Sequence, residues 1–296
     1  MALRKTRTED GAQAPDGDSP LAIIAGGGPL PCVLADITLG RGRPVHIIGL
    51  VGEADEAITR YPHSWMKWGE IGKLFSILEK NGCRDLVMIG KVTRPDVKNL
   101  SVDFGALKSL PFLITLGTGG DDKILSSIVN FFEEKGFRVL GVGQVAPELL
   151  AGEGILGKKT PSSDDREDIA VGFRVLETLG ALDIGQAAVI VNAHVLAVEA
   201  AEGTDAMLSR CADLRKNRYR FRRKRLGVLV KAPKPGQEER IDLPTIGPRT
   251  IERAAEAGLS GIAIGAGRVL IVDREATIAA ANKHGLFLIA EAPSDG

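Results

Sequence analysis

Short apolar runs that end in glycine constrain the fold of this chain more than any other feature. Residues 21–25 read Leu-Ala-Ile-Ile-Ala and lead into the glycines 26–28, and the apolar residues 86–89 lead into Gly90. Strands of a parallel sheet that is covered on both faces read as continuous apolar runs, whereas strands with one wet face alternate. We therefore expect a parallel sheet with helices between its strands, beginning at Leu21.

Helical periodicity separates these runs. Residues 30–39, 71–81 and 121–135 carry apolar side chains three and four positions apart, and Asp121 or Asp122 can cap the third helix. Residues 45–48 and 138–141 read as further strands. Residues 21–146 are thus expected to form a Rossmann-like α/β domain.

The second half repeats the alternation after a break. Residues 147–164 combine glycine, proline and charge, which predicts a linker. Residues 165–296 are expected to form a second α/β domain, with the active site between the two domains. The expected helices are 165–179, 203–212, 248–257 and 274–284, and the expected strands are 187–191, 195–199, 226–231, 261–264, 269–272 and 286–289. Residues 1–20 are polar and read as a disordered tail, not a secretory signal.

Composition excludes several classes of protein. Among the 296 residues, 38 basic side chains balance 38 acidic ones and aromatics make up 4 %, so we expect no nucleic-acid partner. The three cysteines form no CxxC pattern and no apolar run reaches transmembrane length, which favours a cytoplasmic protein. The basic cluster at 215–225 could meet anionic lipid heads, but a solvated helix face or an oligomer contact is the more usual reading.

Glycines at the first strand end suggest a phosphate site. Backbone amides of Gly26, Gly27 and Gly28 could approach a phosphate at the start of the next helix. The full dinucleotide fingerprint is absent, and no acidic residue closes the expected second strand. An ordinary tight turn of a doubly wound sheet is the alternative.

Two polar segments in the second half carry the other candidate residues. Glu202, Gly203, Thr204 and Asp205 precede a helix, where a phosphate or a metal–phosphate unit could bind; simple N-capping is the alternative. The long proline-rich loop between Lys231 and residue 247 follows a strand, and loops at strand ends commonly carry function. Its isolated acid at position 242 could equally form a turn.

Missing motifs narrow the chemistry further. The four histidines show no metal-binding spacing, and there is neither a P-loop nor a nucleophile elbow. A hard cation held by carboxylates, such as Mg²⁺, is the compatible metal.

Taken together, these segments resemble the UDP-2,3-diacylglucosamine pyrophosphatases of the LpxI type, enzymes of lipid A synthesis in Gram-negative bacteria. The resemblance runs from about Leu21 to the last strand, and the segments Glu-Gly-Thr-Asp-Ala-Met at 202–207 and Asp-Leu-Pro-Thr-Ile-Gly at 242–247 are its most specific parts. The other matching stretches are 24–31, 90–96, 120–122, 182–186, 196–200, 231–235 and 272–275.

The resemblance implies a Mg²⁺-dependent reaction in which water attacks the α-phosphorus of UDP-2,3-diacylglucosamine, giving UMP and 2,3-diacylglucosamine 1-phosphate. It implies that Asp242 is essential. We further expect Asp205 and Lys231 to be catalytic, and Asp242, Asp205 and Glu202 to hold the metal. The residues expected to bind substrate are Gly26, Gly27, Gly28, Arg94, Asp121, Asp122, Gln186, Gly203, Thr204, Thr245 and Gly247. A peripheral position on the inner membrane and a homodimer are further expectations.

The lipid part of such a substrate needs an apolar lining, for which we consider Leu107, Leu110, Phe112, Leu113 and Ile114, although ordinary helix core is the alternative for each. The segment near 147–161 could act as a hinge. Two other functions compete. An NAD(P)-dependent oxidoreductase is favoured by the glycine turn and opposed by the incomplete fingerprint, and a non-catalytic nucleotide-binding regulator would bind UDP without turnover.

Overall fold

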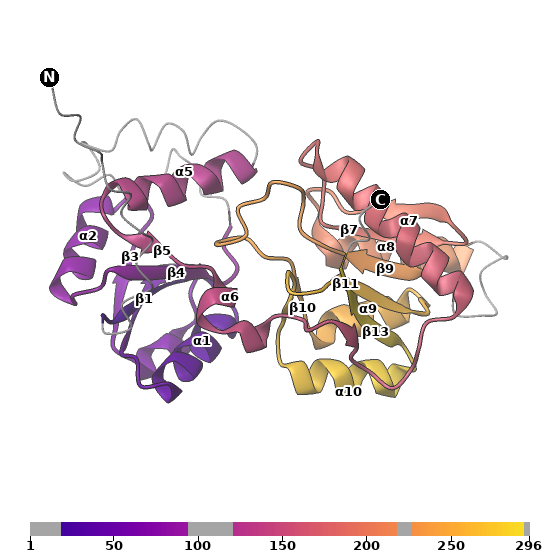
Figure 1. Cartoon of the computed structure of the whole chain (residues 1–296), viewed down its shortest axis with the longest axis horizontal. Helices are drawn as coiled ribbons and strands as arrows, with labels where there is room; N and C mark the ends of the chain where they lie inside the picture. Colours follow the sequence, from indigo (N-terminus) through magenta and orange to yellow (C-terminus); the bar gives the residue numbers. More distant parts are fainter. Residues whose placement is uncertain (1–18, 94–120, 218–225, 293–296) are drawn as a thin grey trace, which may run out of the picture.

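The computed structural model describes residues 19–93, 121–217 and 226–292. Two separate sheets lie side by side, each with helices packed against it, and a two-stranded pair lies between them (Figure 1). The expected fold class, two α/β units with a parallel sheet in the first, is confirmed.

The first sheet has the strand order β3-β2-β1-β4-β5, and all of its strands are parallel. Its strands are β1 (Leu21–Ala25), β2 (Val45–Leu50), β3 (His63–Met66), β4 (Asp85–Ile89) and β5 (Arg138–Val139). Every residue of β1 and β2 is buried, as continuous apolar runs predict.

Helices cover both faces of this sheet (Figure 1). On one face, α1 (Leu30–Gly40), the 3₁₀ turn η1 (Glu56–Arg60), α6 (Val142–Val145) and the 3₁₀ turn η3 (Pro147–Leu149) pack around Ile23 and Ile47. On the other face, α2 (Ile71–Lys80) and α5 (Asp121–Glu134) pack around Ile48 and Leu86. The arrangement is therefore doubly wound.

The second sheet is mixed, with the order β6-β13-β11-β9-β7-β8. Strands β9 (Val228–Lys231), β11 (Gly261–Gly265) and β13 (Phe287–Glu291) are parallel. β7 (Ala187–Val191) pairs antiparallel with β9 and forms a hairpin with β8 (His194–Val198). β6 (Gly154–Ile155) runs antiparallel to β13. β10 (Thr245–Ile246) and β12 (Leu270–Ile271) form the separate pair.

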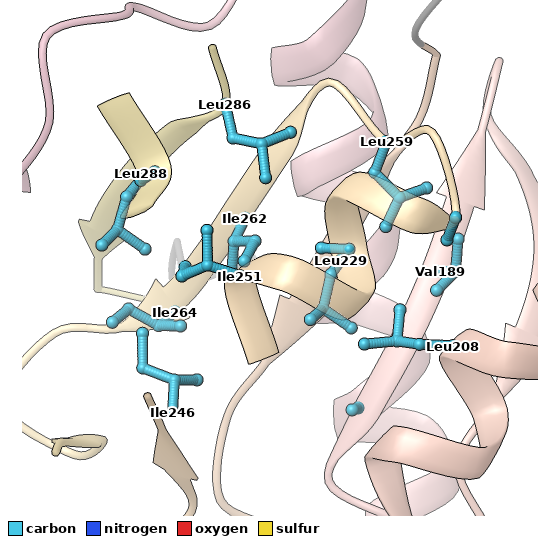
Figure 2. Close-up of a cluster of buried hydrophobic side chains, with 14 of the residues drawn as sticks. Val189, Leu208, Leu229, Ile246, Ile251, Leu259, Ile262, Ile264, Leu286 and Leu288 are labelled. Atoms are coloured by element: carbon cyan, nitrogen blue, oxygen red, sulfur yellow. The ribbon is translucent and has the colours of Figure 1, made fainter. Parts of the chain in front are cut away.

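Four helices cover the second sheet. α7 (Ser163–Gly180) packs on one face, and α8 (Gly203–Asn217), α9 (Pro248–Glu256) and α10 (Arg274–His284) pack on the other. Figure 2 shows the larger apolar cluster on this second face, where Leu208, Ile251 and Leu286 meet side chains of the strands. Burial of this cluster fixes the strand ends that carry the polar residues described below.

Several expected boundaries shift in the structure. Within the expected linker 147–164, residues 147–149 form η3 and residues 154–155 form an edge strand of the second sheet. α8 continues to Asn217, past the expected end at 212. Most of the expected tail (1–20), the expected acyl-contact residues 107–114 and most of the basic cluster fall outside the described residues. None of the described helices combines the length and apolar character needed to cross a membrane, and all three cysteines are buried free thiols.

The loop that follows β9 joins the two halves. Its residue Ile241 packs against the apolar cluster on the α2 and α5 face of the first sheet, and Leu243 packs against the cluster on the opposite face. Arg240 of the same loop donates to Glu133 of α5 at 2.7 Å. The loop that contains the candidate acid Asp242 is thus positioned by the first half of the chain as well as by the second.

Candidate active site

A cleft of about 990 Å³ lies between the two halves and is lined by both. It opens at the carboxyl ends of β1, β2 and β4 in the first sheet and of β9 in the second. In the first sheet, β1 and β4 are neighbours at the point where the strand order reverses, the usual position of ligand sites in open α/β sheets. The residues from the first half that line it include Gly27, Gly28, Pro29, Leu30, Glu53, Lys91 and Thr93.

The amides of the glycine turn already have protein partners. Gly26 donates to the Ile89 carbonyl at 2.9 Å, and Gly27 donates to the Lys91 carbonyl at 2.8 Å. Gly28 donates to the Asp55 carboxylate at 2.7 Å. In this arrangement the three amides do not form an open phosphate cradle, so substrate binding by the turn stays a prediction.

Close packing explains why glycine is needed here. A Cβ atom at Gly26 would lie 2.5 Å from the Lys91 carbonyl oxygen, and one at Gly90 would lie 2.7 Å from the Gly26 carbonyl carbon. Gly90 also has a φ of 110°, which other residues rarely adopt. The turn therefore lets the loops after β1 and β4 touch each other at the cleft wall.

In the second half, a buried lysine heads a chain of hydrogen bonds. Lys231, at the end of β9, is only 8 % exposed and lines the cleft. Its ammonium donates to the Thr204 hydroxyl at 2.9 Å, and that hydroxyl donates its one proton to Glu199 at 2.6 Å. The Glu199 carboxylate also accepts a hydrogen bond from the backbone amide of Gln186 at 3.1 Å.

Burial lowers the pKa of Lys231 below that of an ordinary lysine, and the carboxylates of Glu199, Asp205 and Asp242 oppose this effect. Because Thr204 gives its proton to Glu199, it holds the lysine in place and does not donate to a ligand in this geometry. The arrangement directs a fixed positive charge at the cleft.

Asp242 lies in a tight turn and is held by two amide side chains. Gln237 donates to its carboxylate and to its backbone carbonyl, both at 2.6 Å, and Gln186 donates to the same carboxylate oxygen at 3.1 Å. Gln237 is itself buried and accepts from the Lys234 amide at 2.8 Å. Gln186 thus contacts Glu199 through its backbone amide and Asp242 through its side chain, and so connects these two acids.

Two further acids of the cleft, Asp205 and Glu202, are each paired with an arginine. Asp205 forms a 2.6 Å ion pair with Arg249, a largely exposed residue in the first turn of α9, and Glu202 forms one of 2.9 Å with Arg210. Asp205, Glu202 and Arg249 all line the cleft, as do Gly203, Thr245 and Gly247. The cleft wall on this side therefore carries acids and cations together.

Within residues 19–93, 121–217 and 226–292, no three acidic, histidine or cysteine side chains gather in a way that could hold a metal ion on their own. Mg²⁺ is commonly held by one or two carboxylates while substrate phosphates and water supply its other ligands. Asp205 and Asp242 both line the cleft, so the donor set fits Mg²⁺ of this kind.

An apolar cavity of about 300 Å³ adjoins the cleft. It shares Met88, Ile89, Gly90, Ile241 and Asp242 with the cleft, and its other walls are apolar side chains of the first half. The rest of its lining includes Ile24, Leu50, Met66, Trp68, Leu74, Leu125, Ile128, Phe131 and Phe132. One site therefore offers a charged compartment beside an oily one.

Most of the expected site residues meet at the cleft. Those that line it are Gly27, Gly28, Glu202, Gly203, Thr204, Asp205, Lys231, Asp242, Thr245 and Gly247. Gly26 is not among the residues that line the cleft, and its amide donates a hydrogen bond to the Ile89 carbonyl of β4. Gln186 does not line the cleft either, but its side chain contacts Asp242. Arg94 lies outside the described residues, and Asp121 and Asp122 begin α5 with side chains that are also outside them.

Reasoning from the sequence missed four residues of the site. Glu199 directly follows β8 and accepts a hydrogen bond from Thr204, and Gln237 lies in the proline-rich loop and donates to Asp242. Arg249 pairs with Asp205. Glu53 lines the cleft and accepts a hydrogen bond from the Thr93 backbone amide at 3.1 Å. Glu53 lies three residues beyond the end of β2 at Leu50, so it does not close that strand. The position of Glu199 after an apolar strand was the one usable signal.

Comparison with known proteins agrees with this geometry. The family model described as the LpxI N-terminal domain matches residues 20–149, and the one described as the LpxI C-terminal domain matches residues 152–289. The chain is 47 % identical, over 275 residues, to the UDP-2,3-diacylglucosamine pyrophosphatase LpxI of Caulobacter vibrioides, a match that covers 93 % of this chain and 98 % of the relative. The chain therefore belongs to the LpxI family.

Proposed function

We propose that this protein hydrolyses UDP-2,3-diacylglucosamine to UMP and 2,3-diacylglucosamine 1-phosphate, a step of lipid A biosynthesis. One observation carries the proposal beyond family membership: a charged cleft adjoins an apolar cavity, and the two share Ile241 and Asp242 among their lining residues. A sugar nucleotide with acyl chains needs both environments in one site. A dinucleotide cofactor would leave the apolar compartment without a role.

The reaction joins water to the α-phosphorus. The new bond forms between the water oxygen and that phosphorus, and the bond from the phosphorus to the bridging oxygen breaks. The bridging oxygen leaves with the sugar phosphate, and the water proton passes to solvent or to a carboxylate. Charge on the diphosphate repels the incoming oxygen, so catalysis depends on positive charge and on a correctly placed water.

Lys231 supplies fixed positive charge in this scheme. An ammonium carries three donors, and the one directed at Thr204 sets the direction of the other two. A buried cation interacts more strongly with a phosphate than an exposed one, because water screens it less. We therefore assign Lys231 to the diphosphate oxygens.

In this proposal Asp242 acts on the attacking water. Gln186 and Gln237 fix its carboxylate, which leaves little freedom of rotation. A carboxylate in a fixed position can orient a water molecule and accept its proton as the phosphorus–oxygen bond forms.

Mg²⁺ would be held by Asp205 and Asp242 together with the diphosphate, with Glu202 as a further candidate. When bound, the ion neutralises phosphate charge and polarises the phosphoryl oxygens. Arg249, now paired with Asp205, would then become available to a phosphate oxygen.

The lipid-linked substrate also implies where the protein acts. We propose that it works in the cytoplasm and meets the inner-membrane surface peripherally, and that it forms a homodimer. Co-sedimentation with vesicles that contain the substrate, and analytical ultracentrifugation of the free protein, address these two points separately.

The function is tested by incubating the purified protein with UDP-2,3-diacylglucosamine and Mg²⁺, and separately with excess EDTA. UMP release that EDTA abolishes and added Mg²⁺ restores is the expected result. Binding of UDP without UMP release would favour a nucleotide-binding regulator, and hydrolysis unaffected by EDTA would remove the metal from the scheme.

A further inference from the structure

The residue before Asp242, Ile241, lies at the boundary between the charged cleft and the apolar cavity. Ile241 lines both the charged cleft and the apolar cavity, and it packs against the apolar cluster of the first half. It is only partly buried, so part of its apolar surface faces the cavity. Any apolar ligand that fills the cavity therefore touches the immediate chain neighbour of the candidate catalytic acid.

Hydrogen bonds make the turn around these two residues stiff. The Glu238 carbonyl accepts from the amides of both Ile241 and Asp242, at 3.2 and 3.1 Å. The Glu238 carboxylate binds the Arg240 guanidinium through two contacts of 2.7 Å, and this pairing lowers the pKa of Glu238. Gln237 closes the turn onto Asp242. A shift of Ile241 is thus passed to Asp242 and is not absorbed between them.

Among the described residues, an ion pair and an apolar contact tie this turn to the first half. The Arg240–Glu133 ion pair is about 40 % exposed on both sides, and such surface pairs contribute little. Ile241 is the apolar contact of the turn, and its packing improves when a ligand covers its cavity side. Burial of additional apolar surface is favourable at roughly 25 cal/mol per Å², so an acyl chain in the cavity holds Ile241 more firmly.

We propose that Ile241 is a positioning and specificity residue, through which an acyl chain in the cavity sets the position of Asp242. The acyl chains then raise kcat and not only substrate affinity. Binding energy from a remote, unreactive part of a substrate commonly acts in this way when it orients the reacting groups. This inference rests on the proposed function.

The test compares two substrates and three variants. One substrate is UDP-2,3-diacylglucosamine with long chains, and the other is its analogue with both chains shortened to acetyl groups. For the wild-type protein we expect kcat to fall by about tenfold or more on the short-chain analogue, since small misplacements of a catalytic group are costly. Ile241→Ala should show that reduced kcat on both substrates, and Ile241→Val should restore most of the difference.

Ile128→Ala is the matched control. Ile128 lies on α5, lines the same cavity and is partly buried, but it is not part of the turn that carries Asp242. Its replacement removes the same atoms from the cavity wall, so KM for the long-chain substrate should rise with little change in kcat, the sign of a contact made equally in the ground and transition states.

Equal wild-type kcat values on the two substrates would overturn the inference, and this comparison needs no variant to fold. So would an Ile241→Ala protein that matches Ile128→Ala, with only KM raised. In either case UMP release from the long-chain substrate would leave the proposed function standing. If the wild-type protein releases no UMP from the long-chain substrate, the proposed function fails and the coupling fails with it.

Discussion

The two halves of this molecule contribute different kinds of atoms to the same cleft. The first half, built on a fully parallel sheet, supplies glycine loops, most of an apolar cavity and the charged residues Glu53 and Lys91. The second half, built on a mixed sheet, supplies Lys231, Thr204, Asp205 and Asp242. Under the proposed function, the first half mainly provides shape and lipid recognition and the second half most of the chemistry, and the turn at 238–242 connects them.

The largest expected effect is the loss of the Asp242 charge. Asp242→Asn keeps the shape of the side chain but removes the negative charge that orients water, so kcat should fall by about a thousandfold, as it does when a central electrostatic contact is removed elsewhere. Steady-state kinetics measure this. Asp213→Asn, an exposed acid of α8, is the control and should retain full activity. Near-normal turnover by Asp242→Asn would contradict the assignment of chemistry to the second half.

Removing the buried lysine should be the next most harmful change. Lys231→Met should lower kcat by about a hundredfold because fixed positive charge at the diphosphate is lost. Lys234→Met is a matched control, since Lys234 is equally buried three residues away but pairs with Asp183. The control should lose thermal stability and keep its turnover. Equal losses of turnover in the two variants would show that burial, not position, matters.

The same lysine predicts a pH dependence. Burial lowers its pKa below the ordinary value of 10.5, and the charged form is the active one. Activity should therefore decline as pH rises toward that lowered pKa, earlier than an ordinary lysine would allow. Lys231→Met should lack this alkaline decline in a plot of kcat against pH, and an identical decline in the variant would assign it to another group.

Smaller losses should follow from breaking the support of Lys231. Glu199→Gln and Thr204→Val each interrupt one hydrogen-bond chain, so each should lower kcat by about tenfold, given that hydrogen bonds to charged groups contribute about 1.5–3 kcal/mol. Because both act through Lys231, the double variant should lose little more than the worse single variant. If the fold-losses in kcat of the two single variants multiply in the double variant, the two residues act independently and not both through Lys231.

The first half should respond in stability. Gly26→Ala places a methyl group against the Lys91 carbonyl, so the free energy of unfolding should fall by about 1–3 kcal/mol, as overpacking usually costs. Gly40→Ala, where nothing lies within 4 Å of the added atom, is the control and should not destabilise the protein. Urea denaturation compares the two, and equal stabilities would remove the packing explanation for the glycine turn.

Local patterns in the sequence predicted the central strands well and the edges poorly. β1 and β4 read as continuous apolar runs because both faces are buried, whereas the edge strand β3 is mostly half-buried and carries His63 and Ser64. β10 has only two residues, too few for a period to be visible.

Some site residues could likewise be predicted from the sequence, and others could not. Asp242 and Lys231 could be selected because they follow strands or sit in rigid loops, where function is common. The partner of Gly28 could not, because Asp55 lies 27 residues away along the chain and reaches Gly28 only through folding. The resemblance named the acids, but which hydrogen bonds hold them depends on the tertiary structure.

The most direct test of the proposed reaction follows the oxygen of the attacking water into the products. Wild-type protein, UDP-2,3-diacylglucosamine and Mg²⁺ are combined in heavy-oxygen water, and both products are analysed by mass spectrometry. Attack at the α-phosphorus by a water that Asp242 orients predicts the heavy label in UMP and none in the lipid phosphate. Label in the lipid phosphate, or no UMP at all, would contradict the account.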